Sequence, residues 1–230
     1  PRRLLTCIAD TTIAERAYSN GPMWRAFSDQ QRGFYDVGLI GAAQVDKYGN
    51  LNTTALGDYK QPMVRVAGSG GGNDIGSSVG RLLIMMIQEK RRFVERVDYI
   101  TTPGHLQGSD SRSRAGLRGG GPSAVITTMG VFRFDALTKE MYLEKCHPGL
   151  DPEQIKGNVS WNLKIASDVG TTEIPTQEQV EIMRTLDPYG LYLGGGRQGM
   201  ADPENGFDFY MEVLDKSYDS MTELFRQRGI

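Results

Sequence analysis

The sequence predicts an α/β fold with a helical extension at its C-terminal end. Tyr35 to Gly41 (Y-D-V-G-L-I-G) predicts a buried strand, because both of its faces are apolar. A second apolar strand, Leu82 to Ile87, follows a short predicted helix, and such alternation is typical of α/β proteins. The stretch from Phe207 to Phe225 instead has apolar residues at intervals of three and four, which predicts an amphipathic helix.

Composition restricts the class of protein. A chain of 230 residues is long enough for one α/β domain with additions or for two small domains. The net charge of -2 argues against a nucleic-acid-binding protein, which normally has a basic excess. Cys7 and Cys146 are too few for a disulfide framework, so we expect free thiols in a reducing cytosol. No apolar run has the length of a membrane span and no signal peptide is recognised, so we expect a cytoplasmic protein without a membrane partner.

The remaining elements are predicted from apolar periodicity and from the Gly, Pro and capping residues at their ends. In order, they are a strand at 4–9; a helix from Gly21-Pro22 to Gly33 that carries Trp24 and Phe27; a turn at Tyr48-Gly49-Asn50 with a returning strand at 51–56; a helix at 74–79; a strand at 97–102; a hairpin of 124–134 and 141–146 around Asp135 to Glu140; a helix starting at Asp151; a helix opened by the capping box Thr176 to Gln179; and a Gly-rich linker at 190–199. The C-terminal helix behind this linker has the form of a segment that packs on a partner subunit.

The segment Val66 to Gly76 (V-A-G-S-G-G-G-N-D-I-G) contains the strongest candidate for a binding site. Four glycines in five positions leave backbone N–H groups with no side chain in front of them, and glycine permits positive φ. Such N–H groups bind an anion, either a phosphate or the oxyanion of a reaction intermediate. A dinucleotide loop is disfavoured, because Asn73 replaces the third glycine of G-x-G-x-x-G and the next strand is too near for a crossover helix.

Polar side chains after the first buried strand are a second candidate site. Gln44, Asp46 and Asn52 lie where the carboxyl end of this strand would present them to a substrate. The alternative is that they close the turn through hydrogen bonds from their side chains to the backbone, as Asn and Asp commonly do. Local chemistry alone favours this second interpretation.

The segment from Gly104 to Pro122 is rich in glycine, serine and arginine. It carries six glycines, three serines and Arg112, Arg114 and Arg118, so we expect a mobile, exposed, basic loop. Such a loop could clamp a carboxylate or a phosphate, or it could be an ordinary solvated loop. Its composition does not decide between the two.

Residue spacing predicts neither a metal site nor a nucleophile. No third or fourth ligand stands at metal-binding spacing from His105 or His147. Cys146 and His147 are adjacent, so on a strand their side chains would point to opposite faces. The sequence also lacks the G-x-S-x-G elbow of many hydrolases. We therefore expect no bound metal.

Four motifs together resemble the β subunit of family I coenzyme A transferases, and most closely the glutaconate CoA-transferase type. They are G-A-A-Q-V-D-K-Y-G-N-L-N-T-T at 41–54, G-D-Y-K-Q-P at 57–62, G-S-G-G-G-N-D at 68–74, and E-K-R-R-F-V with D-Y-I-T-T-P-G within 89–104. The resemblance covers 1–188, which predicts a CoA-transferase-like α/β domain there. Residues 189–230, the Gly-rich linker and C-terminal helix, lie outside it.

The resemblance implies an open, mostly parallel α/β sheet with flanking helices, of the CoA-transferase or NagB-like type. It also implies an enzyme that works with an α subunit, in an α2β2 assembly, and moves coenzyme A between carboxylic acids, which include dicarboxylates in the glutaconate type. In that family a glutamate attacks the acyl-CoA thioester and forms an anhydride, then a glutamyl-CoA thioester that the acceptor acid resolves. Coenzyme A is thus the implied cosubstrate.

Site residues are implied by the same motifs. The backbone N–H groups of Gly70, Gly71 and Gly72, followed by Asn73, match the family's glycine loop beside the acyl oxygen and the pantetheine arm, where an oxyanion would be stabilised. Among the polar residues, Gln44 is the better candidate for substrate contact and Asp46 for holding the turn. The resemblance places Arg112 and Arg114 in a loop that contacts the substrate carboxylate or coenzyme A.

The chain departs from the family pattern at the nucleophile. The family's glutamate lies in an E-S-G or E-N-G segment, which the motif order places upstream of Pro1; Glu15 has neither the following glycine nor the strand-end setting. The catalytic residue therefore stays unassigned. Three alternatives follow: a transferase whose glutamate lies outside this sequence, a relative that hydrolyses or decarboxylates an acyl-CoA, and a non-catalytic acyl-CoA-binding subunit. We place the transferase first because the other motifs match it well.

Overall fold

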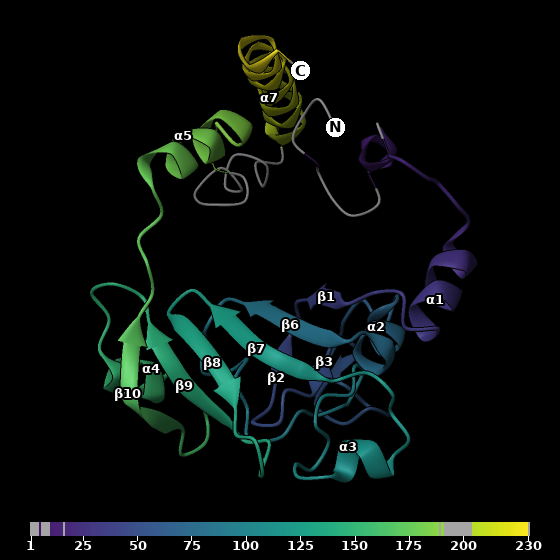
Figure 1. The fold of residues 1–230 in the computed structure, drawn as a ribbon, viewed down its shortest axis with the longest axis vertical. Coiled ribbons are helices and arrows are strands. Elements are labelled where there is room, and N and C mark those ends of the chain that lie inside the picture. Colours follow the sequence, from purple (N-terminus) through teal and green to yellow (C-terminus); the bar gives the residue numbers. More distant parts are fainter. Residues whose placement is uncertain (1–4, 6–9, 16, 189, 191–203, 230) are drawn as a thin grey trace. The chain divides into compact units, whose positions relative to one another are not determined.

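The chain divides into two compact units. The computed structural model describes residues 5, 10–15, 17–188, 190 and 204–229 (Figure 1). One unit is Pro22–Glu173 and holds all described strands, whereas the other combines Pro1–Gly21 with Ile174–Ile230 and is helical where it is described. The division at 188 and 189 that the sequence suggests stays a prediction.

A six-stranded sheet forms the body of the larger unit. Its strands are, in spatial order, β1 (Val37–Ile40), β6 (Arg81–Met86), β7 (Pro122–Thr127), β8 (Gly130–Phe134), β9 (Met141–Cys146) and β10 (Lys164–Thr171). The first three strands run parallel to one another, as do β9 and β10, while β8 is antiparallel to both of its neighbours. The expected α/β fold with an open, mostly parallel sheet is therefore confirmed, with one reversed strand.

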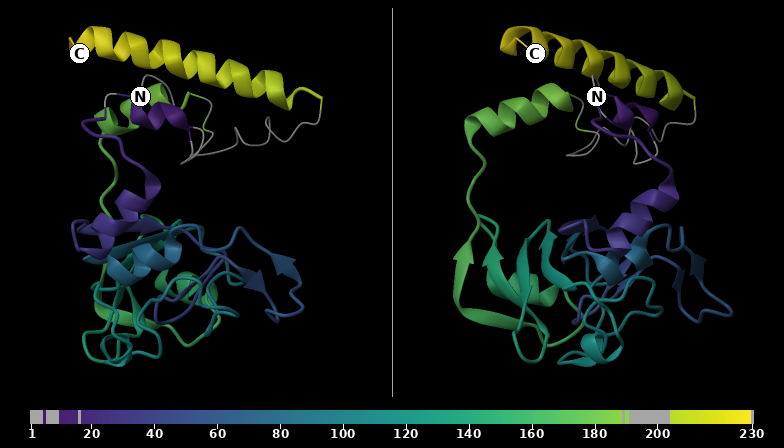
Figure 2. Two further views of the ribbon diagram at one scale, coloured as in Figure 1. Left: turned by 90° about the vertical axis from the view of Figure 1, so that its right-hand side faces the viewer. Right: turned by 45° about the vertical axis from the view of Figure 1, so that its right-hand side comes forward.

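Short helices and two small hairpins surround this sheet. They are α1 (Met23–Gln31), α2 (Gly72–Ser78), α3 (Ser111–Arg114) and α4 (Pro152–Gly157), the hairpin of β2 (Gln44–Val45) with β3 (Leu51–Asn52), and the hairpin of β4 (Ala55–Leu56) with β5 (Val64–Arg65). The turn expected between β2 and β3 is confirmed, and Gly49 in it has a φ of 71°. The β4–β5 hairpin projects from the body of this unit in both views of Figure 2.

The hydrophobic core lies on one face of the sheet. Leu82 and Ile84 of β6 are fully buried there, together with Phe93 and Phe132, whose ring centroids lie 5.9 Å apart. On the other face of the same strands, side chains are open to solvent: Leu39 is 61% and Met85 54% exposed. The strand predicted at 35–41 is thus confirmed as β1, but its expected burial on both faces is wrong, because successive side chains alternate between the two faces.

The smaller unit contains a 3-10 helix, η1 (Thr11–Ala14), and the helices α5 (Gln177–Leu186) and α7 (Gly206–Arg228). The predicted capping box is confirmed at α5, where Thr176 and Gln179 exchange side-chain to backbone hydrogen bonds. The predicted C-terminal amphipathic helix is confirmed as α7, which buries Val213 and Met221. The strand expected at 4–9 lies outside the described residues except for Leu5, and so does the expected linker from 191 onward.

Three sequence-based expectations are wrong in detail. Residues 97–102 form no strand; they pair with β3 only through an isolated bridge between Leu51 and Thr102. The segment 124–134 is two strands, β7 and β8, because the chain reverses at Thr128 and Met129. The sequence analysis also missed β10, whose apolar pattern is interrupted by Ser167, Asp168 and Gly170.

Candidate functional site

The glycine loop runs from β5 into the first turn of α2. Gly68 and Gly70 have φ angles of 87° and 52°, so both adopt the left-handed conformation that glycine permits best. Gly68 is fixed to the neighbouring Thr53 by two hydrogen bonds: its N–H donates to the Thr53 carbonyl, and the Thr53 hydroxyl donates to its carbonyl, both at 2.7 Å. The loop therefore has a defined shape before any ligand binds.

The N–H groups of this loop differ in their availability. The Gly72 N–H donates to the Ser69 carbonyl at 2.7 Å, and the Asn73 N–H donates to the Ser69 hydroxyl at 3.1 Å. Those of Gly70 and Gly71 have no hydrogen-bond partner among the described residues. Of the four residues named from the sequence, Gly70 and Gly71 thus hold the two N–H groups that remain free for an acceptor.

Close packing explains why the other positions are glycine. A Cβ at Gly71 would lie 2.7 Å from Cε1 of Phe27 in α1, and one at Gly72 would lie 2.8 Å from the Thr102 hydroxyl oxygen. At Gly70, by contrast, a Cβ would meet nothing within 4 Å. The open side of the loop is therefore at Gly70, and its packed side is at Gly71 and Gly72.

Thr53 and Thr101 support the loop, and the sequence analysis assigned neither of them a role. The Thr101 hydroxyl accepts from the Thr53 N–H at 2.9 Å, and the Thr101 carbonyl accepts from the Asn73 side-chain amide at 3.3 Å. Both threonines stand inside motifs quoted above, N-T-T and I-T-T-P-G, so their position was the only available signal. Phe27, which packs on Gly71, belongs to no such motif.

Gln44 and Asp46 are buried beside the β2–β3 hairpin, 7% and 3% exposed. The Gln44 amide donates to the Asp98 carboxylate at 3.0 Å, and its carbonyl oxygen accepts from Asn52 at 2.8 Å. Asp46 accepts from the N–H groups of Tyr48 and Asn50 and from the Asn50 side chain. The turn-closing interpretation is therefore confirmed for Asp46, and Gln44 is likewise engaged by neighbouring side chains.

Asp46 is the buried carboxyl of this hairpin. Burial raises the pKa of Asp46 above its ordinary value, whereas the hydrogen bonds from Asn50 and from the backbone act in the opposite direction. These donors occupy both carboxylate oxygens. Its evident role is to hold the hairpin turn.

Arg112 and Arg114 are not brought together. Arg112 is only 6% exposed, so the expectation of an exposed loop is wrong at this residue. Its guanidinium donates to the carbonyls of Gly76, Ser77, Pro103, Gly104 and Gly119 at 2.6 to 3.3 Å. It thereby ties the C-terminal end of α2 to the loop that follows, and burial lowers its pKa. Arg114 is exposed and pairs with Asp110 at 3.2 Å.

The two histidines have structural partners. Burial lowers the pKa of His105 to about 4, so its ring is neutral near pH 7 and its Nε2–H donates to the Pro122 carbonyl at 2.9 Å. His147 contacts the Thr127 carbonyl through Nε2 at 2.9 Å and the Thr172 hydroxyl through Nδ1 at 2.8 Å. Cys146 is buried, which raises the pKa of its thiol, and Cys7 lies outside the described residues.

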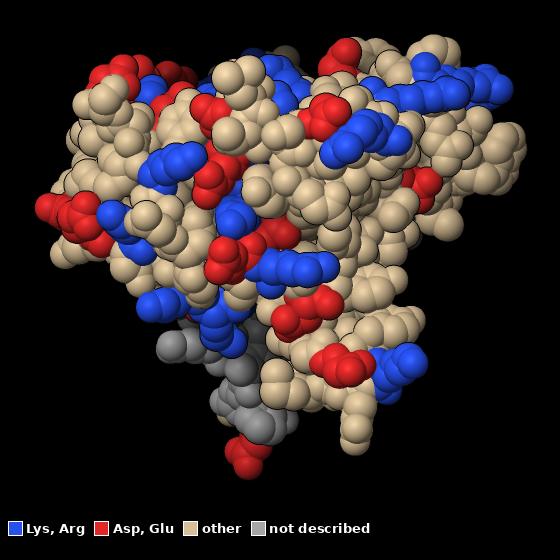
Figure 3. Space-filling view, turned by 90° about the horizontal axis from the view of Figure 1, so that it is seen from below, with Lys and Arg blue, Asp and Glu red and all other residues tan. Residues whose placement is uncertain are grey.

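Surface charge and hydropathy complete the description. Acidic and basic side chains are interspersed on the face shown in Figure 3, in keeping with the small net charge. Within the described ranges, no helix is long and apolar enough to cross a membrane. In the same part of the chain, no group of three or more His, Cys, Asp or Glu could hold a metal ion.

The fold and the loop define an open α/β protein with a candidate anion-binding glycine loop at the start of a helix. The model of the coenzyme A transferase family matches residues 5–158 of this chain. The chain belongs to this family, as its motifs indicate.

Two curated relatives and one solved structure are similar to this chain. A 3-oxoadipate CoA-transferase polypeptide from Pseudomonas knackmussii, the B-type member of its enzyme, is 39% identical over 188 residues, which cover 81% of this chain and 72% of that protein. The corresponding B-type polypeptide of glutaconate CoA-transferase from Acidaminococcus fermentans is 41% identical over 159 residues, 68% of this chain and 59% of that protein. The crystal structure of the Acidaminococcus fermentans enzyme superposes with a TM-score of 0.78 at 34% identity, covering 85% of this chain and 77% of the other.

Proposed function

We propose that this chain is the β subunit of a CoA-transferase that moves coenzyme A between carboxylic acids through a glutamyl-CoA thioester. The observation that carries the proposal is the pair of free N–H groups at Gly70 and Gly71, in a loop held by Thr53 and Thr101. Two relatives at 39% and 41% identity, both named as B-type polypeptides of CoA-transferases, support the reaction class.

The loop would act on the developing oxyanion. Each acyl transfer from a thioester passes through a tetrahedral intermediate, whose oxygen carries the negative charge. Backbone donors already aimed at that position stabilise it without reorganisation, and one such donor typically contributes about a hundredfold or more in rate. Gly70 offers the open approach, because the space in front of it is unoccupied by protein atoms within 4 Å of its missing Cβ.

Substrates and partners follow from the relatives by analogy. The two curated relatives are named for 3-oxoadipate and glutaconate, which are both dicarboxylic acids. We therefore propose a dicarboxylic acid as the acceptor or donor, an α subunit as the partner in an α2β2 enzyme, and the cytoplasm as its location. The attacking glutamate is not assigned to a residue of this chain.

The test uses the complex of this chain with its α subunit. The complex is incubated with succinyl-CoA and either 3-oxoadipate or glutaconate, and the CoA esters are separated by chromatography and identified by mass. A new CoA ester of the added acid is expected. Release of free CoA or carbon dioxide without transfer would show hydrolysis or decarboxylation instead and would contradict the proposal.

The covalent intermediate provides an independent check. Borohydride added after the acyl-CoA would reduce a glutamyl-CoA thioester to a stable alcohol, which peptide mass mapping locates on one of the two chains. A modified glutamate is expected only when acyl-CoA is present. An unmodified complex that nevertheless transfers CoA would exclude this covalent mechanism.

A further inference from the structure

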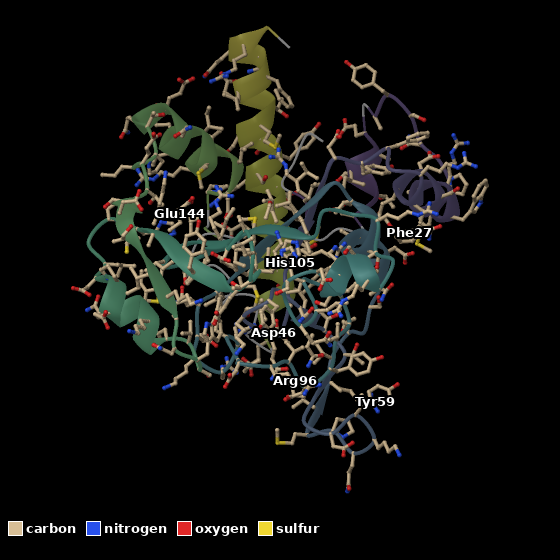
Figure 4. All side chains as sticks on the ribbon, turned by 60° about the horizontal axis from the view of Figure 1, so that its bottom comes forward. Phe27, Asp46, Tyr59, Arg96, His105 and Glu144 are labelled. Atoms are coloured by element: carbon tan, nitrogen blue, oxygen red, sulfur yellow. The ribbon has the colours of Figure 1, made fainter. Side chains whose placement is uncertain are left out.

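A second hollow lies beside the glycine loop, on the far side of the segment 100–102. It has a volume of about 380 Å³, which lies within the usual range of small-ligand pockets. Ile100 and Leu106 contribute apolar walls, while Arg96 and Gln107 contribute polar groups. The labelled Asp46 and Arg96 lie close together in Figure 4, and both line this hollow.

One wall of the hollow has a strained backbone that buried side chains hold in place. Leu106 has a φ of 55°, which is unfavourable for a residue with a branched side chain. The Asn50 side chain fixes it from both sides: it accepts from the Leu106 N–H at 3.1 Å and donates to the Leu106 carbonyl at 2.8 Å. Asn50 is in turn held by Asp46 at 2.9 Å. Strain maintained in this way is concentrated at ligand sites in proteins.

The charges of the hollow leave one cation without compensation. Asp46 is occupied by Asn50 and by backbone donors, and Glu95 pairs with Lys47 at 3.0 Å. Arg96 makes no hydrogen bond or ion pair with any described residue. Its guanidinium therefore presents a full set of donors, which suits a phosphate or a carboxylate.

The hollow is directly connected to the glycine loop through the backbone. Ile100 lines the hollow, and the next residue, Thr101, accepts a hydrogen bond from Asn73 of the loop. On the other strand, Asn50 lies three residues before Thr53, which holds Gly68. Three extended residues span roughly 10 Å. A ligand in the hollow would thus lie about this far from the candidate oxyanion site.

We propose that this hollow binds an adenosine phosphate, with the base against Ile100 and Leu106, the Gln107 amide at its edge and a phosphate on Arg96. A planar base fits apolar walls, an amide pairs with its ring edge, and an unpaired arginine binds its phosphate. The adenosine phosphate is either the 3′-phospho-ADP end of coenzyme A, which rests on the function proposed above, or a free nucleotide.

The experiment compares the complex with its Arg96→Gln variant, and uses Arg91→Gln as the matched control. Arg91 is an exposed arginine of the same segment that pairs with Glu89 outside the hollow. Arg96 has no partner to lose among the described residues, so its variant should fold normally. Adenosine 3′,5′-bisphosphate and 5′-AMP are the probes, and their binding is measured by calorimetry beside the steady-state kinetics of transfer.

If the hollow holds the nucleotide end of coenzyme A, adenosine 3′,5′-bisphosphate competes with acyl-CoA. The Arg96→Gln change then raises the KM for acyl-CoA about tenfold or more, with kcat and the KM for the acid unchanged, as expected for one charge-assisted phosphate contact. If it holds a free nucleotide, a probe binds and loses about the same factor in the variant, while the KM for acyl-CoA stays constant.

Equal binding of both probes by wild type, Arg91→Gln and Arg96→Gln, with equal KM values, overturns the proposal. Binding of neither probe overturns it as well. Both results leave the transferase proposal intact if transfer is still observed. Conversely, a complex that binds a probe through Arg96 but transfers no CoA contradicts the function proposed above and supports the nucleotide site.

Discussion

Replacement of Gly71 by alanine tests how α1 positions the glycine loop. The new Cβ would lie 2.7 Å and 2.8 Å from Cε1 and Cζ of Phe27. Since non-bonded carbon atoms pack at about 3.5 Å or more, either the ring or the loop must move by about 1 Å. A displacement of the loop would move the free N–H groups of Gly70 and Gly71 away from the proposed oxyanion position.

The size of the effect follows from that displacement. A misplacement of about 1 Å at a reacting centre costs about a hundredfold in rate, equivalent to about 2.7 kcal/mol. Overpacking of this kind also lowers the free energy of unfolding by about 1–3 kcal/mol. Shortening Phe27 to alanine removes the obstructing ring, so the double variant Gly71→Ala with Phe27→Ala should recover most of the lost rate.

The assay is a double-mutant cycle on the complex with the α subunit. The kcat for CoA transfer and the urea midpoint of unfolding are measured for wild type, both single variants and the double variant. Gly157→Ala is the control, because a Cβ there meets nothing within 4 Å, and it should keep wild-type kcat. The reasoning is refuted if Gly71→Ala keeps wild-type kcat, or if the Phe27→Ala change restores none of its loss.

Further predictions concern stability. The pKa of His105 is about 4 in the fold and near 6.5 when unfolded, so the neutral ring contributes stability that is complete above pH 6.5 and lost as the pH falls toward 4. Between pH 7.5 and 4.5, urea unfolding should show a loss about 2 to 3 kcal/mol larger for wild type than for His105→Gln, which does not titrate; equal losses would contradict the assignment. Arg112→Ala leaves several buried carbonyls unpaired and should lower the free energy of unfolding by about 3 kcal/mol or more. The exposed Arg114→Ala should change it by about 0.5 kcal/mol or less. If Arg112→Ala unfolds like wild type and raises only the KM for a substrate, its contact is with the substrate and not with α2.

Much of the fold could be predicted from local signals. The helices α1, α5 and α7 follow from Pro, capping residues and apolar spacing, and β1 and β6 follow from apolar runs. The failures have a common cause. Val97 to Thr102 resembles a strand in composition, but Asp98 instead bonds to Gln44 and to the N–H of Gly57, and no continuous neighbouring strand is available to it among the described residues. Strand formation depends on a partner, which is a property of distant sequence.

The candidate site shows the same division. The glycine run, its positive φ angles and the family membership could be predicted from the sequence, because they depend on residue type and order. Which N–H groups remain free could not, since that depends on Ser69, Thr53 and Phe27 lying against the loop. The charge of Arg112 also suggested an exposed clamp, whereas the structure buries it against backbone carbonyls.

The sequence by itself thus determined the class of protein and the location of the glycine loop. Only the tertiary structure decided which groups of the loop face outward, that Arg112 is a structural tie, and that Arg96 is left without a partner among the described residues in a second hollow. The physical reason is that residue type fixes what a group can bond to. Whether it is already bonded depends on neighbours that are brought together only by folding.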